Sequence, residues 1–352
     1  MTKADFKRLL RRLAITGGLE VAHGLAKLGV LASARGRGMI LTLHHVQPFR
    51  PAAFAPNRHL EITPEFLEKT ILQLKAAGFR FARLDDVPAL MAEGEPGAPF
   101  VVFTLDDGFR NNAEHAVPIF ERHGVPCTIF VCKGLSERSH TMWWETAAAL
   151  IGAQDQVTLD FGGGAIAFDT RTLSGKLGAF DHVCKQIFVG DETRAIERLN
   201  ATAQSAGIDP HAIVADTVMN ADELRALVTG HPLVSFGAHT VSHRGLGFLP
   251  DDVVLDELNQ SADYVATLSG SRPTTFAYPY GDRRSATPKT AALADWAGFK
   301  LSVTTRPATL CCNAMSAPQS LPRLSLNGFY QKPRYVTALT SGIPTKLAYG
   351  GC

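Results

Sequence analysis

The feature that most constrains the fold is a series of short apolar runs separated by stretches with helical character. The clearest run is residues 100–105, FVVFTL, which is almost free of polar side chains, as expected for a parallel strand that is covered on both faces. Similar runs are found at residues 39–43, 79–84, 127–131, 233–236, 275–278 and 300–304. Helical patterns lie between them. Strands that alternate with helices predict an α/β fold, either a barrel or an open, doubly wound sheet.

Residues 137–221 interrupt this alternation. They contain a glycine-rich turn at residues 162–164 and a helical stretch at residues 191–206. We therefore expect a main domain at residues 39–345 that carries an insertion at about residues 137–221.

Residues 1–38 precede the first predicted strand and form a basic extension. Apolar side chains recur there at helical spacing, and Lys and Arg fill the positions between them: Phe6, Leu9, Leu10 and Leu13. This pattern predicts an amphipathic helix on an anionic membrane surface, a helix docked on the main domain, or a loosely ordered extension. A secretory signal would also begin with basic residues, but here polar residues and glycines break the apolar stretch that should follow. We therefore expect a cytoplasmic protein, which lies at the inner membrane surface if the helix binds lipid.

The composition excludes several classes of protein. Charged residues make up 19% of the chain and hydrophobic residues 45%, which is not the composition of a mainly disordered protein. Lys and Arg total 35 against 33 Asp and Glu, so the formal net charge is +2. That balance does not predict nucleic-acid binding, and no nucleic-acid motif supports it.

Polar residues with metal-binding potential follow two of the predicted strands. Asp106 and Asp107 come directly after residues 100–105, and adjacent carboxylates repel each other unless a positive charge lies nearby. His239 and His243 follow another strand at a spacing of about one helical turn, so both imidazoles can face one ion. Two histidines and one carboxylate are a common ligand set for a catalytic divalent metal. The alternative for the aspartates alone is an Asp-Asp-Gly turn.

A third signal is the segment 276–281, FAYPYG, in which an apolar strand ends in a Pro-Tyr-Gly turn. Such a turn can expose a backbone N–H to a substrate oxygen, although a plain turn is the better explanation of the pattern alone.

Together these three segments resemble the motifs of the NodB-homology polysaccharide deacetylases, carbohydrate esterase family 4. That family carries Thr-Phe-Asp-Asp-Gly, then His-Ser/Thr-x-x-His, then Arg-x-Pro-aromatic. This chain has TLDDG at residues 104–108, HTVSH at residues 239–243 and AYPY at residues 277–280. Residues 40–46 also resemble the strand that opens many such domains.

The resemblance implies a distorted (β/α) barrel of about seven parallel strands. It also implies metal-dependent hydrolysis of N-acetyl groups on GlcNAc-containing oligo- or polysaccharides, with release of acetate. On the matching positions, Asp107, His239 and His243 would bind the metal, Asp106 would be the general base, and Tyr280 would donate its backbone N–H to the oxyanion. Zn²⁺ is the metal expected for this ligand set, with Co²⁺, Ni²⁺ or Mn²⁺ as alternatives.

The chain departs from the family pattern at two points. Ala277 stands where the family has an arginine that orients the catalytic aspartate, and Arg323 or Arg272 is a candidate replacement. The late Leu-His-Asp motif, whose histidine serves as the general acid, is missing. His44 resembles a histidine found on the first strand in some branches of the family and is the candidate acid; the alternative is a structural histidine. Trp143 and Trp144 either form a sugar-stacking wall or pack in a core.

These departures leave two alternative functions open beside the N-deacetylase. One is a family member that binds N-acetylated glycan without hydrolysing it. The other is a metal hydrolase that acts on an amide outside the sugars. The expected partner of the enzyme is an N-acetylated glycan, with no nucleic acid and with membrane contact only through the extension.

Overall fold

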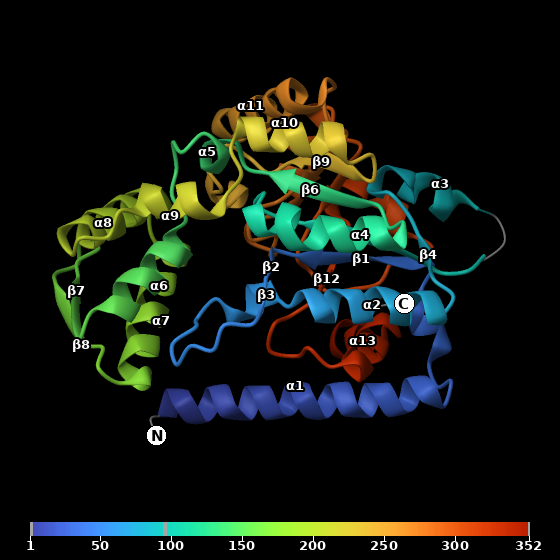
Figure 1. Cartoon of the computed structure of the whole chain (residues 1–352), viewed down its shortest axis with the longest axis horizontal. Coiled ribbons are helices and arrows are strands. Elements are labelled where there is room, and N and C mark those ends of the chain that lie inside the picture. The colour runs from blue at the N-terminus through green and yellow to red at the C-terminus, as the bar shows by residue number, and fades with distance from the viewer. Residues whose placement is uncertain (1–2, 94–96, 351–352) are drawn as a thin grey trace.

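A parallel β-sheet that curls around a core forms the centre of the structure, a computed structural model that describes residues 3–93 and 97–350 and, for residues 3–5, the backbone only (Figure 1). Seven strands follow one another in the order β11-β10-β9-β6-β5-β1-β12, and β4 pairs with the start of β5. A further parallel bridge joins Val303 of β11 to Leu321, just before β12, so the curled sheet approaches closure. The predicted distorted barrel of about seven parallel strands is confirmed. The strands are β1 Gly38–Leu43, β4 Arg80–Phe81, β5 Phe100–Leu105, β6 Cys127–Val131, β9 Val234–Ala238, β10 Thr275–Ala277, β11 Leu301–Val303 and β12 Leu324–Ser325.

Helices surround this sheet, and their sequences explain where they begin. In α2, Thr63 caps the helix by accepting a hydrogen bond from the Phe66 N–H, and Pro64 occupies the first turn. The predicted strand at residues 79–84 is shorter than expected, because a 3₁₀ turn at Leu84–Asp86 leads directly into α3. The helices around the sheet are α2 Pro64–Ala76, α3 Val87–Ala92, α4 Val117–His123, α5 Lys133–Ser136, α10 Ala221–Gly230, α11 Asp251–Ser269, α12 Pro288–Trp296, α13 Pro333–Thr340 and α14 Ile343–Tyr349.

The predicted insertion contains a helical lobe beside the sheet, seen on the left of Figure 1. It has a hydrophobic cluster of its own, to which Trp143, Leu150, Phe180 and Leu199 contribute. The glycines at residues 162–164 form the turn of its β-hairpin, as expected. The limits of the insertion stay a prediction. The lobe is built from α6 Trp143–Ala153, β7 Gln156–Leu159, β8 Ile166–Asp169, α7 Leu173–Val189, α8 Glu192–Ser205 and α9 Pro210–Thr217.

The N-terminal extension forms one long helix, α1 Lys3–Lys27, which runs along the lower edge of the molecule in Figure 1. Residues 1 and 2, which precede the helix, lie outside the described part of the chain. Leu19 and Ala22 are buried in a small cluster with Tyr335 of α13 and Ile343 of α14, so this part of the helix is docked. No helix in the described ranges is both long enough and apolar enough to span a bilayer.

Candidate metal centre and active-site pocket

Two adjacent carboxylates at the end of β5 point in different directions. Asp106 and Asp107 are both almost completely buried. Asp107 has a φ of 73°, in the left-handed region that non-glycine residues rarely adopt. This backbone turn separates the two side chains: Asp106 faces Arg323, whereas Asp107 faces His239 and His243. Backbone strain of this kind is characteristic of functional sites.

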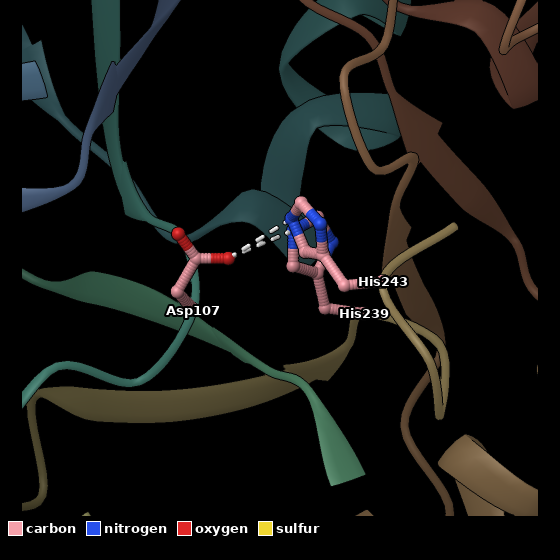
Figure 2. A group of neighbouring side chains, drawn as sticks. All are labelled: Asp107, His239 and His243. Carbon is pink, nitrogen blue, oxygen red and sulfur yellow. Dashed lines mark ion pairs between the residues drawn. The ribbon is translucent and has the colours of Figure 1, made fainter. Parts of the chain in front are cut away.

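The side chains of Asp107, His239 and His243 converge on one point (Figure 2). The Asp107 Oδ1 atom lies 3.4 Å from His239 Nε2 and 3.2 Å from His243 Nε2, and the three ligand atoms all lie within 4.8 Å of one another. Among the described residues, no hydrogen-bond partner satisfies Asp107 Oδ1, although this oxygen is buried. The His239 Nδ1 atom lies 2.7 Å from the Ala277 carbonyl oxygen, which leaves Nε2 free to face an ion.

The electrostatics of Asp107 also suit a metal ligand. Burial raises the pKa of this carboxyl, but the neighbouring His243 and His239 outweigh that effect and hold the pKa well below its usual range. The group is therefore an ionised carboxylate that faces two imidazole nitrogens. This donor set fits a zinc-type divalent cation with coordination positions left open for water and substrate.

The two histidines reach this point through a loop and not through the helical turn that their spacing suggested. Thr240 and His243 both have positive φ values, of 63° and 55°. A buried carboxylate, Glu257 of α11, holds the loop: it accepts hydrogen bonds from the N–H groups of Val241 at 2.7 Å and Ser242 at 2.9 Å. Glu257 was not predicted from the sequence, because nothing in the pattern of α11 distinguishes it from other helical glutamates.

Of the two candidates for the missing motif arginine, Arg323 is the one that contacts Asp106. Its guanidinium forms a two-pronged ion pair with Asp106, with both N···O distances at 2.7 Å, and its side chain is fully buried. It also donates to Thr104 Oγ1 and to the Thr304 carbonyl, each at 3.0 Å. The other candidate, Arg272, pairs with Asp263 at the surface. Arg323 directly precedes β12. Because β1 lies between β12 and β5 in the sheet, Arg323 lies near the end of β5.

The Arg323 pair decides the ionisation of Asp106. Burial raises the pKa of Asp106, but the charge of Arg323 and its hydrogen bonds outweigh burial, so that the pKa is lowered. Asp106 is therefore an ionised carboxylate beside the candidate metal centre and able to accept a proton.

His44 and His45 lie in different environments. The His44 Nε2 atom lies 3.8 Å from Asp106 Oδ2, and the ring lines the same pocket. Burial lowers the pKa of His44 by more than the attraction of Asp106 raises it. His45 stacks on Phe109 with ring centroids 3.6 Å apart, and its Nδ1 lies 2.9 Å from Asn111 Nδ2. His44 is therefore the one of the two that faces the site, and His45 is a packed structural histidine.

Tyr280 is fixed above the histidines by groups from the insertion. Its hydroxyl donates to Glu192 at 2.6 Å and accepts from Trp143 Nε1 at 2.9 Å. Its φ is 60°, and its carbonyl accepts from Thr305 Oγ1. Within the described part of the chain, no hydrogen bond engages its backbone N–H. Burial and Glu192 raise the pKa of the Tyr280 phenol far above its ordinary value, so the hydroxyl stays neutral.

One pocket of about 440 Å³ lies between the barrel and the helical lobe. The barrel supplies Asp106 and Asp107 together with His44, His239 and His243, and the lobe closes one side with Trp143, Trp144, Phe180, Cys184 and Phe188. The two tryptophans line the pocket and are also more than nine-tenths buried in the lobe. The insertion therefore builds a wall of the site.

Comparisons with known proteins show a resemblance to one family over part of the chain. The sequence model of the family described as "Polysaccharide deacetylase" matches residues 199–299, a stretch that contains His239, His243 and Glu257. Residues 199–299 therefore resemble part of a polysaccharide deacetylase domain. The predicted resemblance to the NodB-homology deacetylases is confirmed. This deacetylase family implies a hydrolase that acts on N-acetyl amide bonds of glycans. No protein of curated function matches the chain by sequence.

Solved structures share the deacetylase fold. The deacetylase PplD from Streptococcus pyogenes, in complex with acetate, aligns with a TM-score of 0.53 and 18% identity over 82% of this chain and 92% of its own. A putative polysaccharide deacetylase from Bacillus anthracis gives 0.53 and 12%, over 86% and 68% of the two chains. IcaB from Ammonifex degensii gives 0.51 and 16%, over 86% and 97%. At these identities the likeness establishes the NodB-like fold and nothing finer.

Proposed function

We propose that the chain is a metal-dependent hydrolase that removes N-acetyl groups from GlcNAc-containing oligo- or polysaccharide and releases acetate. The observation that carries this proposal is the convergence of two differently placed carboxylates in one pocket. Asp107 joins His239 and His243 in a donor set for a divalent cation, and Asp106 lies beside it, held by Arg323. Zn²⁺ suits this set best, and Co²⁺, Ni²⁺ and Mn²⁺ are the alternatives.

In the proposed reaction, each group has one task. The cation, when bound, supplies Lewis acidity for the amide carbonyl. Asp106, which Arg323 keeps ionised and oriented, accepts a proton from the attacking water. The backbone N–H of Tyr280 donates to the carbonyl oxygen as negative charge develops there.

The leaving amine needs a proton before the C–N bond breaks, and His44 is the proposed donor. Its Nε2 atom lies 3.8 Å from the Asp106 carboxylate, which is the group that takes up the proton from water. Because burial lowers the pKa of His44, the ring is neutral at rest and would gain its proton during the reaction. A proton that moves from Asp106 through His44 to the amine balances the hydrolysis of the amide to acetate and amine.

Reconstitution with metal tests the proposal. The full chain is treated with a chelator, and acetate release from N-acetylglucosamine oligomers is measured with and without added Zn²⁺ or Co²⁺. The proposal expects release that depends on added metal. Stoichiometric oligosaccharide binding without acetate release, in protein that holds one metal ion, would favour the non-catalytic alternative instead.

The position of Arg323 weakens that alternative. The missing motif arginine was one of two sequence departures in its favour, and Arg323, which directly precedes β12, instead holds Asp106 in a two-pronged ion pair. The absent late histidine motif is the remaining reason, and substitution of His44 addresses it directly.

A further inference from the structure

Helix α1 has one face that is docked on the rest of the protein. Leu19 and Ala22 are buried against α13 and α14. Nearer the N-terminus, Arg8 forms an ion pair with Asp181 of α7, and the Arg12 guanidinium lies 4.1 Å from the centre of the Phe329 ring. The helix therefore connects the barrel to the lobe, and its orientation about its own axis is fixed.

The opposite face of α1 carries an exposed apolar stripe along the whole helix. We call it the outer stripe; it consists of Phe6, Leu10, Leu13 and Val21 of the helix and of Leu28 directly after it, which are 49%, 48%, 59%, 60% and 78% exposed. Steps of three, four, seven and eight residues return to the same side of an α-helix, so these side chains lie in one row. The residues between them in this row are small: Ala14, Gly17 and Gly24. Exposed apolar side chains that gather on one face of a helix mark an interaction surface.

Positive charges border the outer stripe. Lys7, Arg11 and Lys27 are exposed on α1, on the flanks of the stripe. Among the described side chains of the helix, Glu20 is the only acidic one, and it is paired with Arg334 and Tyr335 on the docked side. The exposed face therefore combines apolar side chains in the middle with cations at the margins, which complements an anionic lipid surface.

We propose that the outer stripe lays α1 flat on an anionic membrane surface, with its apolar side chains among the lipid headgroups and acyl chains and with Lys7, Arg11 and Lys27 on lipid phosphates. The helix has 25 residues, so the contact extends over about 37 Å. One helix, α7, connects this surface to the pocket: Asp181 contacts Arg8, and the adjacent Phe180 lines the pocket wall. A last step rests on the proposed function: the pocket acts on N-acetylated glycans that are held at the lipid surface.

Vesicle co-sedimentation of the full chain tests the proposal. Vesicles of phosphatidylcholine are compared with vesicles that contain phosphatidylglycerol, at low and high salt. We expect binding to the phosphatidylglycerol vesicles, weaker binding at high salt, and little binding to pure phosphatidylcholine. The triple variant Leu10→Glu/Leu13→Glu/Val21→Glu should lower the affinity at least about tenfold, because it removes apolar contact and adds repulsion.

A matched control has the same change in charge at exposed apolar positions elsewhere. Leu72, Ile166 and Leu173 are 49%, 46% and 50% exposed and lie outside α1. Leu72→Glu/Ile166→Glu/Leu173→Glu should keep most of the vesicle binding. An equal loss in both triple variants, or no binding of the wild-type chain to anionic vesicles, would overturn the proposal. So would a stripe variant that only converts a dimer to a monomer in analytical ultracentrifugation, because a second copy would then be the occupant.

The failure of this inference can be told apart from failure of the proposed function. Vesicle binding requires no turnover, and acetate release from soluble oligomers requires no vesicles. The stripe variant should release acetate from soluble oligomers at the wild-type rate.

Discussion

Removal of Arg323 should affect stability and catalysis together. The guanidinium is fully buried and satisfies both oxygens of Asp106 at 2.7 Å. In Arg323→Met, Asp106 stays buried but loses the positive charge that pairs with it. Breaking a buried, hydrogen-bonded ion pair by removing one partner costs about 3–5 kcal/mol of unfolding free energy. The surface arginine that the sequence offered as an alternative, Arg272, pairs with an exposed aspartate, so Arg272→Met should cost less than about 1 kcal/mol.

The pH dependence separates a positioning role from a merely structural one. Arg323 lowers the pKa of Asp106, whereas burial raises it. Without the arginine, burial prevails and the pKa rises, so the acid limb of the rate profile should move to higher pH. The contribution of Asp106 to the unfolding free energy should depend on pH in the corresponding direction. A lowered folded-state pKa stabilises the protein above the unfolded pKa, and this stabilisation is lost as the pH falls through the folded value. The stability difference between wild type and Arg323→Met should therefore shrink toward acid pH.

The assays are urea denaturation at several pH values and acetate release with metal added. Arg323→Lys keeps a charge but only one prong of the contact, so it should recover part of the stability and part of the rate. Three results would refute the reasoning: full turnover in Arg323→Met, an acid limb that does not move, or an equal loss in Arg272→Met.

Three further predictions concern residues in and around the site. Burial raises the pKa of Glu145 in α6 from 4.5 to about 7, and repulsion from Glu61 adds to this effect. The unfolding free energy of the wild type should therefore fall by up to about 3 kcal/mol as the pH rises between those two values. Thermal melts of Glu145→Gln over the same pH range should show no such fall. Glu257→Gln should weaken metal affinity about 10- to 100-fold, because Glu257 holds the histidine loop. A competition titration with a chromogenic chelator measures this, and the control Glu197→Gln, at an exposed position, should leave the affinity unchanged. Tyr280→Phe removes the hydroxyl contacts but keeps the backbone N–H, so kcat for acetate release should change less than about tenfold; a loss of a thousandfold would assign the chemistry to the phenol.

The sequence predicted most of the sheet, because its central strands are apolar runs that tertiary contacts only reinforce. Residues 100–105 form β5 with the predicted limits, and every residue of the strand is buried. The short strand β4 was less predictable, since the turn at Leu84–Asp86 competes for the same residues. The docking of α1 was one of several alternatives, because its helical pattern does not say which face finds a partner.

The site was predictable where the motif carries the chemistry and not where the fold supplies it. Asp107, His239 and His243 were identified from two short motifs, and their side chains do converge. Arg323 was one of two candidates, and only the pairing of β12 with β1 places it beside Asp106. Glu257 left no signal, because its role depends on how α11 packs against a loop distant in sequence.

Some assignments stay predictions. The geometry is compatible with Asp106 as the base, His44 as the acid and the Tyr280 N–H as the oxyanion donor, and substitution of each is required to establish its role. The cytoplasmic location also stays a prediction, since none of the contacts described above depends on the compartment.

The central claim is that two neighbouring carboxylates do different work, and one paired measurement tests it most directly. Metal content and acetate release are determined side by side for the wild type, Asp106→Asn and Asp107→Asn. We expect Asp106→Asn to retain one metal ion per chain and to lose turnover, and Asp107→Asn to lose both. An active Asp106→Asn protein, or an Asp107→Asn protein that binds metal as tightly as the wild type, would contradict the account.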